Sequence, residues 1–160
     1  MKQRLVEWDR LQVRILGSRI AVLAREAVRR SGAPVEIQSV DFRAGDAEIA
    51  GTLRKGLALP FSFHLRTIAV EGRTLRLPIE QLTVAGFLPV PTLLFRLAEG
   101  FGSMKGVAID PERKTVIVSV DRFLPEFVDV EIEAVRIIET GVEVTLGRGG
   151  ADPPGAGGGW

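Results

Sequence analysis

Residues 4–30 read RLVEWDRLQVRILGSRIAVLAREAVRR and contain no proline and one glycine. The next four residues, Ser31-Gly32-Ala33-Pro34, are typical of a helix end. On a helical wheel, one group of apolar residues falls within a single arc: Val13, Leu16, Ile20, Leu23, Ala24, Ala27 and Val28. The pattern predicts one long amphipathic helix over residues 4–30, with this arc facing the core.

The same wheel has a second, narrower apolar stripe nearly opposite the first. Its members are Trp8, Leu11, Ile15 and Val22. Arginines lie between the two stripes: Arg10, Arg14, Arg25 and Arg29 on one side, Arg19 and Arg30 on the other. A helix with two apolar stripes is contacted on two sides. The second contact is a wrapping sheet, a second subunit or an apolar ligand.

After Pro34 the apolar residues alternate, which is typical of strands. The clearest strand covers residues 57–65, and a switch of parity near Ser39 predicts a β-bulge. A short helix is expected over Thr92–Gly100, after Pro91. About four strands precede that helix and about four follow it. The prediction is an α+β fold, in which a strongly curved antiparallel sheet of about eight strands packs around the long helix.

One domain is expected over residues 1–146, because domains commonly contain about 100–200 residues. Residues 147–160 are mostly Gly, Pro and Ala, and a disordered tail is expected there. No signal peptide and no membrane span are apparent, so a cytoplasmic location is expected. The chain has no Asn, Cys or Tyr, a composition that is typical of a thermostable protein.

The residue inventory argues against an enzyme. There is no cysteine, His64 is the only histidine and Gly-x-Ser-x-Gly is absent, so no nucleophile with a positioned base can be identified. Neither a metal nor a cofactor is expected, and no catalytic residue is assigned.

Charge is unevenly placed along the chain. Residues 1–31 carry eight Lys and Arg against three Asp and Glu, whereas the whole chain has a net charge of +1. The basic first segment and the acidic last one either face each other or present two separate surfaces to partners. Because the overall charge is nearly neutral, nucleic-acid binding is not expected.

Three stretches resemble a known family: Leu82–Pro91, Gly106–Pro111 and Val118–Pro125. They resemble small bacterial proteins related to the LmeA-type phospholipid-binding family. The resemblance implies a fold like that of tubular lipid-binding proteins. In such a fold a long helix lies in a bent antiparallel sheet and an acyl chain occupies the gap.

The first functional hypothesis is non-enzymatic binding of an apolar or lipid-like ligand between the helix and the curved sheet. Such a site needs a wide apolar lining. The candidate lining residues are Leu16, Ile20, Leu23, Phe61, Phe63, Phe87, Leu94, Phe101 and Phe123. The arginines of the first helix would attract anionic headgroups, and a peripheral contact with a membrane is compatible with this site.

The alternative hypothesis is a structural or interaction protein with no small-molecule ligand. It would form a homodimer through the N-terminal helix, with Trp8, Leu11, Ile15 and Val22 as the contact stripe.

Overall fold

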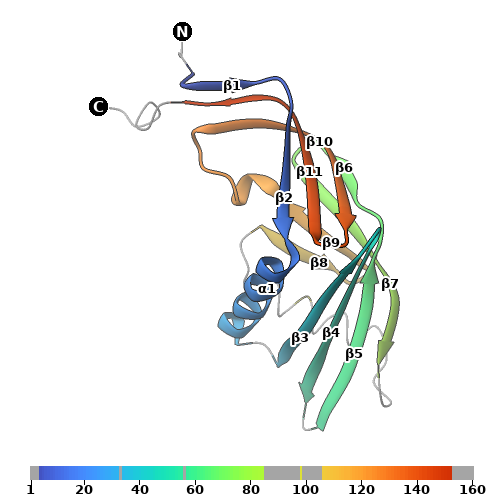
Figure 1. The fold of residues 1–160 in the computed structure, drawn as a ribbon. Coiled ribbons are helices and arrows are strands. Elements are labelled where there is room, and N and C mark those ends of the chain that lie inside the picture. Colours follow the sequence, from blue (N-terminus) through green and yellow to red (C-terminus); the bar gives the residue numbers. More distant parts are fainter. Residues whose placement is uncertain (1–3, 33, 56, 85–97, 99–105, 153–160) are drawn as a thin grey trace.

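The computed structural model describes residues 4–32, 34–55, 57–84, 98 and 106–152 (Figure 1). Their elements in chain order are β1 (Val6–Trp8), β2 (Leu11–Leu16), α1 (Gly17–Ser31), β3 (Val35–Arg43), β4 (Asp46–Lys55), β5 (Leu57–Leu65), β6 (Ala69–Glu71), β7 (Thr74–Val84), β8 (Val107–Asp110), β9 (Thr115–Ser119), the 3-10 turn η1 (Val120–Arg122), β10 (Val128–Ile138) and β11 (Gly141–Ala151). The predicted α+β class, with mainly antiparallel sheet and a helix, is confirmed. The predicted strand number is wrong, because the described residues form eleven strands in two sheets.

The first sheet joins the two ends of the chain, and we call it the terminal sheet. In it β11 is central, with β10 on one side and both β1 and β2 on the other. Val6 pairs with Ala151 and Leu11 pairs with Leu146, so the first strands run antiparallel to the last one. Figure 1 shows β1 and the end of β11 side by side.

The second sheet has the strand order β3-β4-β5-β7-β9-β8, with β6 paired to β7, and we call it the hairpin sheet. All its pairings are antiparallel, as tight turns between consecutive strands require. The register shifts between Ile37 and Ser39, which confirms the predicted bulge near Ser39. The two sheets meet where Gly45 donates its N–H to the carbonyl of Ile137 at 2.9 Å.

The long helix predicted over residues 4–30 is wrong for residues 4–16. These residues form β1 and β2, and α1 begins only at Gly17. Leu11, Val13 and Ile15 satisfy the alternation of a strand, and they pair with apolar residues of β11. Leu11 and Ile15 are also four residues apart, which fits one face of a helix. The apolar pattern of this short run is therefore compatible with both a strand and a helix.

The predicted disordered tail is wrong for residues 147–151, which complete β11. The glycines of this stretch have a structural use. A Cβ on Gly149 would lie 2.8 Å from the Trp8 indole nitrogen and 2.6 Å from the carbonyl oxygen of Asp129. Glycine at this position therefore lets Trp8 pack directly on the strand backbone.

Apolar side chains from α1 and the hairpin sheet form the main core. Val28 of α1 and Leu53 of β4 are its most deeply buried members, and Phe61 and Phe63 of β5 lie among them. Figure 1 shows α1 lying beside β3, at the edge of the hairpin sheet. Of the predicted short helix over 92–100, only Ala98 is among the described residues, and it packs against this core.

Candidate functional site

A pocket of about 610 Å³ opens between the second half of α1 and the start of β3. The local sequence creates it. Gly32 adopts a left-handed conformation (φ 71°) and ends the helix, so Pro34 leads the chain back beneath α1 as β3. The pocket is lined by Arg25, Val28, Arg29, Gly32, Pro34, Val35, Glu36, Ile37, Gln38 and Arg54.

The floor of the pocket is apolar. Val28 comes from α1, and Val35 and Ile37 come from alternate positions of β3, so all three also belong to the buried core. Because the floor is part of the core, it is held by packing on the far side. The exposed fractions of these residues are 1%, 7% and 4%, so only the edge of the core borders the pocket.

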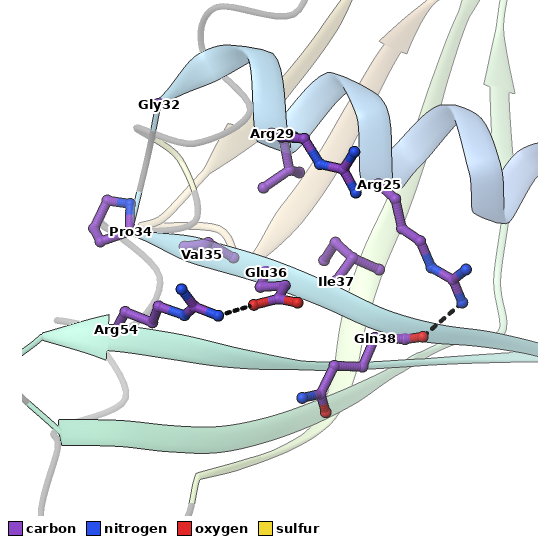
Figure 2. A pocket seen from close by; sticks show the side chains of 10 residues that line it. Arg25, Arg29, Gly32, Pro34, Val35, Glu36, Ile37, Gln38 and Arg54 are labelled. Atoms are coloured by element: carbon purple, nitrogen blue, oxygen red, sulfur yellow. Dashed lines mark hydrogen bonds and ion pairs between the residues drawn. The ribbon is translucent and has the colours of Figure 1, made fainter.

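Charged side chains surround that floor (Figure 2). Arg25 donates from Nη2 to the main-chain carbonyl of Gln38 at 2.6 Å. Arg54 of β4 donates from Nη2 to Glu36 Oε2 at 2.5 Å. Arg29 forms no ion pair with any residue that the structure describes. The lining of the pocket thus carries three guanidinium groups and one carboxylate, that of Glu36, so its net charge is positive.

This arrangement suits an anionic group with an apolar body. A guanidinium donates parallel hydrogen bonds to a carboxylate or a phosphate, and Arg25 and Arg29 lie one helical turn apart. The floor would contact an aliphatic chain. Arginines in a last helical turn also stabilise the helix dipole, and this would by itself explain Arg29 and Arg30. It does not explain Arg54, which comes from the hairpin sheet.

The predicted apolar lining is not assembled into one site. Phe61 and Phe63 are each 3% exposed and stack on each other, with ring centroids 6.3 Å apart, so they belong to the core. Ile20 is half-buried on the inner side of α1. Three other candidates point outward, with exposed fractions of 56% for Leu16, 61% for Leu23 and 54% for Phe123. Phe87, Leu94 and Phe101 lie outside the described residues.

The predicted contact stripe on one helix is wrong, because its residues lie on three elements. Trp8 is on β1, Leu11 and Ile15 are on β2, and Val22 is on α1. The register of the terminal sheet nevertheless places the first three on one apolar face. The face comprises Val6, Trp8, Leu11, Val13, Ile15, Val128, Val130, Ile132, Val135, Ile137, Val142, Val144 and Leu146. It is buried at Val130, Ile132 and Ile137 on β10, and it is exposed along β2, at the edge of the sheet.

The opposite face of the terminal sheet is held together by ion pairs. Arg4 lies 2.9 Å from Asp129, Arg10 3.7 Å from Glu133 and Arg14 3.5 Å from Glu143. The basic first segment therefore faces the acidic last one, which decides between the two alternatives that the charge distribution left open. Four further arginines lie on α1: Arg19, Arg25, Arg29 and Arg30.

His64 lies on the polar side of the hairpin sheet. Its Nδ1 is 3.0 Å from both carboxylate oxygens of Asp46, and its Nε2 is 3.8 Å from Glu48. The nearby Ser62 hydroxyl shares a hydrogen bond with Thr83 at 2.8 Å. Among the described residues, no three His, Asp or Glu side chains are placed to hold a metal ion. The pair of Asp46 and His64 therefore joins β4 to β5.

Nothing in the described part of the chain is a helix with the length and apolar character needed to cross a membrane. No family model, curated protein or solved structure gave a significant match to the chain.

Proposed function

We propose that this protein is a non-enzymatic module that binds an anionic, lipid-like ligand in the pocket between α1 and β3. One observation supports the proposal above the others: three arginines and three apolar core residues line the same pocket. The anionic group of the ligand would meet Arg25, Arg29 and Arg54, and its chain would lie on Val28, Val35 and Ile37.

Arg29 is the best residue for a test, because it is exposed and its substitution breaks no described ion pair. The matched control is Arg30, which is adjacent in sequence but does not line the pocket. Titration calorimetry would compare decyl phosphate, decanoate and decanol as ligands. We expect both anions to bind and decanol to bind at least about tenfold more weakly.

Arg29→Gln should weaken binding of the anions about tenfold, and Arg30→Gln should leave it unchanged. Native mass spectrometry of gently purified protein should also show co-purified lipid-like mass. Equal binding of decanol and the anions, or no binding of any of the three, would overturn the proposal.

A second candidate function is homodimer formation through β2. Leu11, Val13 and Ile15 form an exposed apolar row, and β2 is an edge strand whose outer side has no partner strand among the described residues. Sedimentation velocity of the wild type should then show a dimer that Leu11→Glu or Ile15→Glu dissociates. Leu16→Glu is the matched control, since Leu16 is also exposed but faces the other side of β2. A wild-type monomer would exclude this candidate.

A further inference from the structure

The outward side of α1 combines large apolar side chains with arginines. Leu16 at the helix start, Val22 and Leu23 are all exposed. The helical period arranges the outward residues in two adjacent rows. One row comprises Arg19, Leu23 and Arg30, and the other comprises Val22, Arg25 and Arg29. Each row combines one large aliphatic side chain with two arginines.

The outward side of α1 has a strongly positive charge, and most of its arginines have no carboxylate partner among the described residues. The helix carries four arginines and one acidic residue, Glu26, which lies 3.9 Å from Arg30. Arg25 is hydrogen-bonded to a carbonyl and keeps its charge. Within the described residues Arg19 and Arg29 have no carboxylate partner. By contrast, the arginines that precede α1 are paired with acidic residues of β10 and β11: Arg4 with Asp129, Arg10 with Glu133 and Arg14 with Glu143.

We infer that α1 is a docking surface for a lipid bilayer that contains anionic phospholipid. Arginines attract the negative surface of such a bilayer, and exposed aliphatic side chains insert at the boundary between headgroups and acyl chains. A second copy of the chain does not fit, because two such helices would repel each other. A nucleic acid would use the arginines but leave Leu16, Val22 and Leu23 without a role, since bases stack on aromatic side chains.

The position of the pocket strengthens this inference, which in this respect rests on the proposed function. Arg25 and Arg29 belong both to the outward side of α1 and to the rim of the pocket (Figure 2). A molecule that lies on a bilayer with α1 against the headgroups therefore brings the pocket rim to the same surface. An anionic lipid would reach the pocket without crossing water.

Cosedimentation with vesicles tests the surface. We expect the wild type to bind vesicles of phosphatidylcholine mixed with phosphatidylglycerol, and not vesicles of phosphatidylcholine alone. Binding should weaken as NaCl is raised from about 0.05 M to about 0.5 M. Leu23→Glu should lower the partition coefficient at least about tenfold, because it removes an inserted aliphatic group and adds a negative charge.

Leu5→Glu is the matched control. Leu5 is 66% exposed, close to the level of Leu23, and it precedes β1 at the end of the terminal sheet away from α1 (Figure 1). This variant should bind vesicles like the wild type. Circular dichroism of both variants would check that each is folded.

Three results would overturn the docking surface: equal binding to both vesicle types, binding that Leu23→Glu leaves unchanged, and binding to a short RNA that matches binding to anionic vesicles. Arg54→Gln separates this inference from the proposed function, since Arg54 lines the pocket but lies on β4. It should weaken decyl phosphate binding and leave vesicle binding intact. Loss of vesicle binding by Leu23→Glu with decyl phosphate binding retained supports the docking surface independently of the pocket.

Discussion

Glu143 shows how a single buried charge organises the terminal sheet. Its side chain is 5% exposed, and it lies on the central strand β11 between Arg136 of β10 and Arg14 of β2. The hydrogen bond from Arg136 lowers the pKa of Glu143, an effect that outweighs burial, and the positive charges of Arg136 and Arg14 add to it. Since a buried charge is costly without partners, Glu143 holds both flanking strands in place.

The lowered pKa of Glu143 predicts a particular dependence of stability on pH. Its ordinary pKa is 4.5, and the folded-state value is lower. The stability that it contributes is therefore fully present above its unfolded-state pKa and is lost as pH falls through the folded-state value. Glu143→Gln should lower the melting temperature at neutral pH and flatten its decline below about pH 4.5.

Thermal unfolding followed by circular dichroism between neutral and acidic pH checks this prediction. Glu133→Gln is the control, because Glu133 is exposed and its pair with Arg10 is long, at 3.7 Å. That variant should lie within about 0.5 kcal/mol of the wild type at every pH. Parallel pH curves for Glu143→Gln and the wild type would contradict the account.

Gly141 is a position at which the backbone conformation requires glycine. Its φ is 145°, and a Cβ there would lie 2.1 Å from the carbonyl oxygen of Ile15. Gly141→Ala should therefore lower the free energy of unfolding by about 2 kcal/mol or more. Gly72→Ala, at φ 61° with open space around it, should cost only about 1 kcal/mol. Equal losses in urea denaturation would show that the close approach to β2 has no energetic weight.

At the scale of elements, the hairpin strands were predictable and the first strands were not. Residues 57–65 alternate over nine positions and have a single interpretation. Leu11–Leu16 covers six positions and runs directly into α1, so the apolar residues of the two elements combined into an apparent helix. What makes β2 a strand is its pairing with β11, more than a hundred residues later, and no local pattern contains that information.

Chemical shifts of the Cα carbons test this assignment directly. Residues 11–16 should show the negative secondary shifts of extended backbone, and residues 18–30 should show the positive shifts of a helix. The change should occur at Gly17, where a Cβ would lie 2.4 Å from the ring of Phe42. Positive shifts continuing through Leu11–Leu16 would contradict the observed topology.

The candidate site was predictable only in part, because it also depends on strand pairing that no local pattern contains. The arginines of α1 were recognised as candidates for an anionic headgroup, and Arg25 and Arg29 indeed line the pocket. Arg54 was missed, because it reaches the pocket from β4 through the pairing of Val35 with Leu53. The large apolar residues were assigned to a ligand, whereas Phe61 and Phe63 are part of the solid core. An apolar face by itself does not distinguish a cavity from a packed interior.

At the scale of the whole molecule, the terminal sheet ties the two ends of the chain together. Within the described residues, β1 pairs only with residues 149–151 of β11, and Trp8 packs on Gly149. Truncation after Leu146 removes this partner and exposes Trp8. It should lower the melting temperature by about 5 °C or more. Truncation after Asp152 retains all of β11 and should leave the melting temperature unchanged, whereas equal melting of the two truncated chains would show that the end of β11 contributes nothing.

The difference in charge between the terminal sheet and α1 bears on binding. Ion pairs neutralise the polar face of the terminal sheet, whereas Arg19 and Arg29 of α1 have no carboxylate partner among the described residues. These two arginines would direct the long-range attraction of an anion toward α1 and the pocket beside it.

A titration of the isotope-labelled protein with decyl phosphate, followed through its amide NMR signals, tests the central claim most directly. The account predicts saturable shifts that are largest at residues 25–32 and 35–38 and at Arg54, and that are much smaller in Arg29→Gln. Shifts confined to β2, or no saturable shifts at all, would contradict a ligand site between α1 and β3.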